Sequence, residues 1–234
     1  MKEFCLILNK IEYNLMCFHI VVKMNLVSIS YFSSCLIYCV LSCCLEISLA
    51  KWLKLVPGLI LVATRPNSRL CLIFAVLGDA FLMDQDNYFK LGILSFGVYQ
   101  FMIWLRFSKT KKIYPWIVII TSVFTWFLNC QDLQMSMLIF VYANIITHAL
   151  ISSMYRMVNM WTNQNFANFL GMFMFIISDI LIALEYFNVL NEYLWGLNVF
   201  LSCSSIILTY WLGIYLTTLE NQSNRILICS ELYN

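Results

Sequence analysis

Charged residues are scarce in this chain, and their scarcity decides its class. Of 234 residues, 11% are Asp, Glu, Lys or Arg and 62% are apolar. An average soluble protein carries about 25% charged residues. Only lipid satisfies so large a surplus of apolar surface. The composition excludes an ordinary soluble domain and indicates an integral membrane protein.

Net charge, glycine and proline are also low. A formal charge of +2 is too small to indicate nucleic acid as a partner. With 7 glycines and 3 prolines, the composition is neither repeat-rich nor disordered. The 10 cysteines lie largely inside apolar runs without any CxxC pair, which favours small buried side chains over disulfides or zinc ligands. There is no Walker, Rossmann, GxSxG or HExxH pattern, and we expect neither a metal nor another cofactor.

Long apolar runs alternate with short polar turns along the chain. Each run must be helical, because isolated strands leave backbone groups unsatisfied in lipid. We predict an all-α polytopic membrane bundle of about eight transmembrane helices within residues 25–219, preceded by an interfacial segment at 1–24 and followed by a polar tail at 220–234. The expected spans are residues 24–45, 49–64, 70–83, 88–105, 113–128, 133–155, 165–186 and 193–219.

The basic residues predict the orientation of this bundle. With the N-terminus inside, only Lys51, Lys54 and Lys90 of the 14 Lys and Arg residues fall outside, which leaves eleven on the inner side. Inner loops of membrane proteins carry this excess of positive charge. We therefore expect both termini in the cytosol. The endoplasmic reticulum membrane is the default location for a multi-pass chain without a recognisable targeting signal.

Two aspartates interrupt apolar runs in matching contexts, Asp79 after Gly78 and Asp179 after Ser178. Counted from the inner ends of their helices, Asp79, Asp179 and Lys54 all lie about 15–16 Å deep, near the centre of a core about 30 Å thick. A carboxylate at that depth costs a few kcal/mol, so its presence points to a function. An intramembrane acid pair with a lysine is the leading hypothesis. Alternatively, each aspartate is a packing acceptor between helices, and Lys54 extends to the headgroups.

Other polar residues within the spans are candidates for substrate binding: Gln100, His148, Tyr142 and Asn198. Such groups either line a cavity shared with the acid pair or form hydrogen bonds that bridge helices.

Three motifs, spread between Lys51 and Leu219, have a specific spacing. They are the Gly-Asp run Phe74–Leu82 followed by Tyr-Phe-Lys-Leu-Gly, the run Gly171–Leu184 with its Ser-Asp, and Lys54–Pro57, which reads Lys-x-x-Pro. In these motifs the chain resembles the YhhN-like lysoplasmalogenases, a family of eight-helix membrane proteins. It departs from the family at Gln100, where a histidine is usual, and at Leu201–Ile206, which lacks the expected Thr-Tyr-Tyr-x-x-Gln run.

The resemblance implies hydrolysis of the vinyl ether bond of a lysoplasmalogen, a lysophospholipid of the membrane, to a fatty aldehyde and glycerophosphoethanolamine or glycerophosphocholine. It implies carboxylate acid/base chemistry by Asp79 and Asp179, supported by Lys54, with the roles of the two acids left open. No metal is needed for this reaction. A catalytically lapsed lipid-binding relative and a proton-coupled transporter are the alternative functions.

Overall fold

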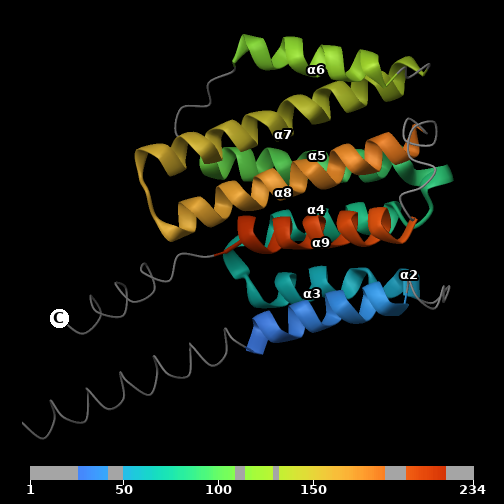
Figure 1. Ribbon diagram of the computed structural model, residues 1–234, viewed down its shortest axis with the longest axis vertical. Helices are drawn as coiled ribbons and strands as arrows, with labels where there is room; N and C mark the ends of the chain where they lie inside the picture. The colour runs from blue at the N-terminus through green and yellow to red at the C-terminus, as the bar shows by residue number, and fades with distance from the viewer. Residues whose placement is uncertain (1–25, 42–49, 109–113, 129–131, 188–198, 220–234) are drawn as a thin grey trace, which may run out of the picture.

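A computed structural model describes residues 26–41, 50–108, 114–128, 132–187 and 199–219 (Figure 1). The regular elements within these ranges are helices, which confirms the predicted all-α fold for the described part of the chain. The elements are the helix Leu26–Cys39, α2 (Ala50–Leu53), α3 (Leu55–Thr64), the 3-10 turn η2 (Pro66–Ser68), α4 (Arg69–Phe81), α5 (Gln85–Phe107), α6 (Pro115–Phe127), α7 (Leu133–Asn159), α8 (Asn163–Tyr186) and α9 (Val199–Thr217). The predicted segments 1–24 and 220–234 lie outside the described residues.

Every predicted span contains a helix, although several helices are shorter than expected. Within the described residues, three helices are long and apolar enough to cross a membrane, namely those in α5, α7 and α8. The pair formed by α3 and the helix from Pro66 to Phe81 meets the criterion together, with a bend of 116° between them, and makes a fourth. The helices Leu26–Cys39 and Pro115–Trp126 are apolar but shorter.

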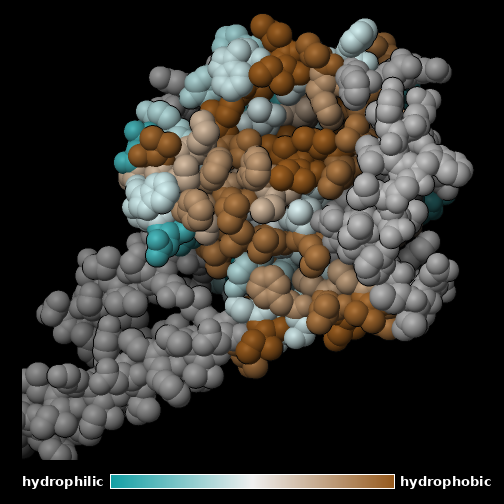
Figure 2. All heavy atoms as spheres, in the orientation of Figure 1, coloured by the Kyte–Doolittle hydropathy of each residue, from teal (hydrophilic) through white to brown (hydrophobic). Residues whose placement is uncertain are grey.

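The outer surface of the bundle is apolar, as expected of a protein surrounded by lipid. Large side chains are exposed on several helices, among them Trp126 at 82%, Val158 at 68% and Ile119 at 66%. Figure 2 shows hydrophobic residues across much of one face. In water so much exposed apolar area would drive association. The chain is therefore a membrane protein.

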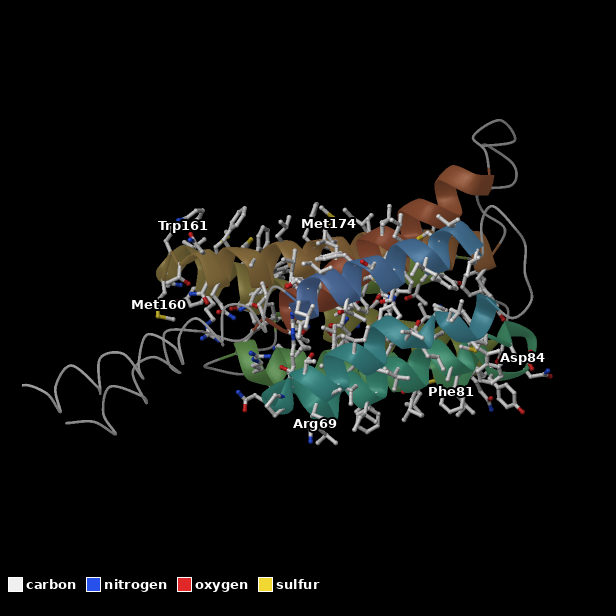
Figure 3. All side chains as sticks on the ribbon, turned by 90° about the horizontal axis from the view of Figure 1, so that it is seen from below. Arg69, Phe81, Asp84, Met160, Trp161 and Met174 are labelled. Carbon is white, nitrogen blue, oxygen red and sulfur yellow. The ribbon has the colours of Figure 1, made fainter. Side chains whose placement is uncertain are left out.

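The helices form two layers with smaller elements at the edges. In Figure 3, α4 and α5 lie on one side of the bundle and α8 and α9 on the other. Figure 1 shows α6 beside α7 at one edge and α3 with Leu26–Cys39 at the opposite edge. We call the end that carries Arg65, Arg69, Arg106 and Arg156 the basic end. We predict that the basic end faces the cytosol.

Polar contacts fasten the helices at the basic end. The Nη1 atom of Arg106 donates to the Ser68 hydroxyl over 2.9 Å, which joins the end of α5 to η2. The buried Arg65 donates to the Thr218 hydroxyl over 2.5 Å and to the carbonyl of Tyr215 over 2.7 Å. Arg65 thus satisfies carbonyl and hydroxyl oxygens at the C-terminal end of α9, where helices leave acceptors unpaired.

Glycines let particular helices approach closely. A Cβ atom on Gly78 of α4 would lie 2.6 Å from the ring of Phe96 on α5. On α8, a Cβ atom on Gly171 would lie 2.8 Å from the backbone nitrogen of Thr217 on α9. Small residues at such contacts are typical of membrane helix pairs. The first contact sets the position of Asp79, the residue after Gly78.

A break separates α2 from α3 at Lys54. Pro57 is buried in the first turn of α3, and a proline within a helix cannot donate a hydrogen bond to the carbonyl four residues earlier. That carbonyl belongs to Leu53, the last residue of α2. The interruption therefore follows from the Lys-x-x-Pro spacing. The sequence predicted one continuous span at 49–64, and the proline is the reason for the difference.

Candidate functional site

A cavity of about 270 Å³ lies within the bundle, and the acid pair lines it. Its polar side chains include Lys54, Asp79, Tyr142, Asp179 and Tyr210, contributed by five different parts of the chain. The rest of the wall is apolar apart from Thr121 and Thr147 and is built mainly by α5, α6, α7 and α8. A mostly apolar cavity with a few convergent polar groups is the usual form of a small-molecule site.

Asp79 is held by two partners from other helices. Its carboxylate is buried, with one oxygen 3.0 Å from the Nζ atom of Lys54 and the other accepting a 2.6 Å hydrogen bond from the Tyr210 hydroxyl. The Lys54 ammonium also lies 6.0 Å from the centre of the Tyr210 ring. The juxtaposition of Lys54 with Asp79 expected from their equal depth is therefore present. An adjacent ammonium favours the ionised form of a carboxyl group.

Asp179 has different surroundings. Its Oδ2 atom accepts a hydrogen bond from the hydroxyl of Tyr142 on α7, and no lysine or arginine of the described residues forms an ion pair with it. Apolar side chains such as Ile176, Ile180 and Ala183 surround it on the cavity wall. A carboxyl group that is removed from water and lacks a cation favours its neutral form.

The two carboxyl groups thus share a cavity but differ in charge environment. Each has a tyrosine as hydrogen-bond donor, and only Asp79 has a cation. Enzymes separate acid from base roles by giving two carboxyl groups unlike environments. The arrangement places one carboxyl group with an adjacent ammonium and one without a cation next to the same apolar space.

The other predicted substrate-binding residues lie elsewhere. Gln100 is completely buried and is not part of the cavity wall, and Asn198 lies outside the described residues. His148 joins helices: its Nε2 atom accepts a 3.1 Å hydrogen bond from the backbone of Tyr114, just before α6, and its Nδ1 atom lies 2.8 Å from the carbonyl of Asn144. Tyr142 alone of the four lines the cavity.

Tyr210 is the cavity residue that sequence reasoning missed. The family resemblance predicts a Thr-Tyr-Tyr-x-x-Gln run at Leu201–Ile206, whereas Thr209 and Tyr210 lie further along the same helix and match its first two positions. This Thr-Tyr pair is the signal in the sequence that indicates the missed residue. The described helix α9 carries the Tyr210 hydroxyl to Asp79.

The described part of the chain holds no group of three or more His, Cys, Asp or Glu side chains placed to bind a metal ion. The ionisable groups on the cavity wall are the two carboxyl groups, the Lys54 ammonium and the phenols of Tyr142 and Tyr210.

Comparisons with known proteins place the chain in a family. A search of the curated proteins and a search of the solved structures each found no match. A family model described as the YhhN family matches residues 62–220, a segment that includes Asp79, Tyr142, Asp179 and Tyr210. The match covers more than half of the 234 residues. The chain is therefore a member of the YhhN family.

Proposed function

We propose that this protein is a membrane-embedded hydrolase that cleaves the vinyl ether bond of lysoplasmalogens, releasing a fatty aldehyde and glycerophosphoethanolamine or glycerophosphocholine. The observation that carries the proposal is the unequal pair of carboxyl groups in one apolar cavity. Its substrate is a single-chain membrane lipid, and its proposed location is the endoplasmic reticulum membrane.

The first step is protonation of carbon. The neutral Asp179 carboxyl donates its proton to the second carbon of the alkenyl chain, and the electron pair of the double bond forms the new C–H bond. The product is an oxocarbenium ion at the first carbon, with Asp179 now ionised. Because Oδ2 of Asp179 accepts from Tyr142, the transferred proton belongs to Oδ1. The Asp79 carboxylate stabilises the developing cation.

The second step is capture of the cation by water. Asp79 takes a proton from the water as its oxygen bonds to the first carbon, which gives a hemiacetal. Asp79 then returns that proton to the glycerol oxygen as the C–O bond breaks. Asp179 removes the proton of the hemiacetal hydroxyl, and the aldehyde forms. Both carboxyl groups are back in their starting states after one molecule of water is consumed.

Lys54 and the two phenols position the acids in this scheme. Lys54 keeps Asp79 ionised between turnovers, and Tyr210 holds its second oxygen. Tyr142 orients Asp179 and lies on the cavity wall, where the substrate also contacts it. Gln100 and His148 lie off the wall and serve the packing of the bundle in this proposal.

The experiment is to measure fatty aldehyde release from lysoplasmenylethanolamine by the purified protein in D₂O. Carbon protonation places one deuterium on the second carbon of the aldehyde, which mass spectrometry detects. Asp79→Asn and Asp179→Asn should each lower turnover by about a hundredfold or more while remaining folded. Aldehyde without deuterium, or full turnover in either variant, would refute the mechanism.

A lapsed, lipid-binding relative is the second candidate, suggested by the family's usual histidine being Gln100 here. The structure weakens this reason, because Gln100 does not reach the cavity wall. Absence of turnover in well-folded protein that still binds lysoplasmenylethanolamine would favour this candidate over the hydrolase.

A further inference from the structure

We propose that the lipid reaches the cavity sideways from the bilayer, through a portal between α6 and α8 whose rims are Ile120 and Ile180. This inference rests on the proposed function for the identity of the lipid. The entry path follows from the residues of the cavity wall, and one of its two tests does not require the protein to hydrolyse the lipid.

Among the described residues that line the cavity, two are strongly exposed. Ile120 on α6 has an exposed fraction of 55% and Ile180 on α8 one of 39%. The other lining residues are buried or only partly exposed, so these two isoleucines mark where the wall is one side chain thick. Asp179 precedes Ile180, which places the acid next to this thin part of the wall.

The two rims of the portal lie on helices that flank α7. Figure 1 shows α6 and α8 on either side of α7, with α6 at the edge of the bundle. Cavity-lining residues recur on one face of α7, at Ile139, Tyr142, Ala143 and Ile146. This face forms the floor between the two rims. The strongly exposed Val141, on another side of α7, is not part of the cavity wall.

The surroundings of the portal identify its occupant as a hydrocarbon chain. Exposed residues near the Ile120 rim are mostly apolar, including Val118 and Val123 on α6, and Ser122 is the polar exception. A charged headgroup would lose its hydration there without gaining a partner, whereas an alkenyl chain moves from lipid into an apolar cavity at little cost. The hydrocarbon chain of a single-chain lipid can thus enter the cavity first, which brings the ether bond to Asp179.

Tryptophan substitutions at the rims test the portal. Ile120→Trp and Ile180→Trp enlarge side chains that line the opening. Ile119→Trp and Phe173→Trp are matched controls, because they place the same side chain on exposed sites of the same two helices away from the cavity wall. In proteoliposomes containing lysoplasmenylethanolamine, we expect each rim variant to lower kcat/KM by about tenfold and each control by less than about twofold.

A second measurement separates the portal from the hydrolase. A lysophosphatidylethanolamine with a diazirine in its chain, activated by light in the same vesicles, should label α6 and α8 of the native protein near Ile120 and Ile180. Labelling should fall in the rim variants and persist in the controls. This labelling can be measured even if the protein releases no aldehyde. Should a rim variant misfold, Ile120→Ala and Ile180→Ala, which widen the opening, should raise labelling. Equal labelling of rim and control variants, or labels confined to helices other than α6 and α8, would overturn the proposal.

Discussion

Removing Lys54 should leave the buried Asp79 without its cation, and the cost can be worked out from the geometry. At an effective dielectric constant of about 20, two unit charges 3.0 Å apart attract by about 5 kcal/mol before desolvation is subtracted. Deleting one member of a buried pair typically costs about 3–5 kcal/mol. The Lys54 side chain keeps 21% of its exposure, so we expect the lower end, about 3 kcal/mol, for Lys54→Met.

A double-mutant cycle isolates the contribution of the pair. Asp79→Asn alone should cost less than Lys54→Met, because the remaining ammonium is less buried than the remaining carboxylate. The double variant Lys54→Met/Asp79→Asn should recover most of the loss, because it leaves no charge at either position. We therefore expect a coupling energy of about 2 kcal/mol, from unfolding titrations in detergent. Turnover should fall by about a hundredfold in both single variants.

The surface ion pair between Lys90 and Asp132 provides the control. Its atoms are 2.6 Å apart, but the side chains are 46% and 49% exposed. Lys90→Met should leave both unfolding and turnover unchanged, because solvent screens an exposed pair. If the effects of Lys54→Met and Asp79→Asn simply add, within about 0.5 kcal/mol, the two residues are independent and the reasoning fails.

Variants at four further positions test the residues that support the site. Tyr210→Phe should lower kcat about tenfold, since a hydrogen bond to the charged Asp79 contributes about 1.5 kcal/mol or more, and Tyr142→Phe should lower it about fivefold, since a hydrogen bond to the neutral Asp179 contributes about 1 kcal/mol; unchanged kcat in both would show that neither phenol positions its acid. Pro57→Ala should restore the hydrogen bond to the Leu53 carbonyl and leave turnover nearly unchanged, because the backbone of Lys54 is already helical, with φ −55° and ψ −30°; a loss as large as that of Lys54→Met would contradict this. His148→Ala should lower the free energy of unfolding by about 1 kcal/mol by leaving a backbone N–H unpaired, and His148→Gln should recover part of it; equal stability of the two would argue against that hydrogen bond.

The positions of the helices were predictable because apolar runs mark the helices and charged or polar residues mark the turns between them. The elbow between α3 and α4 falls at the basic turn Arg65–Arg69, as expected from positively charged loops. The shared depth of Lys54 and the two aspartates was predictable as well, since helix rise converts position along the chain into depth. Depth did not choose between Asp79, Asp179 and the headgroups as the partner of Lys54, and the structure shows that the partner is Asp79.

The depth of a residue in the membrane does not tell on which side of its helix the residue lies. Tyr142 and His148 occupy the same helix, yet one faces the cavity and the other binds the backbone before α6. In a span that is apolar on all sides, the sequence does not distinguish a lipid-facing side from a cavity-facing side. The same ambiguity applies to Gln100, whose helix packs on several neighbours. Polar residues within membrane helices therefore predict a depth, and packing decides their partner.

Asp79 and Asp179 have different surroundings because their helices pack against different neighbours. Asp79 comes next to Gly78, and the close approach of α4 to α5 at that glycine keeps the carboxylate inside the bundle, where Tyr210 and Lys54 reach it. Asp179 instead lies on the part of α8 that borders the thin cavity wall. A cation beside Asp179 would stand next to lipid at the portal, where its charge is most costly. In the proposed mechanism, the ionised acid therefore lies in the interior and the neutral acid at the side from which the apolar chain arrives.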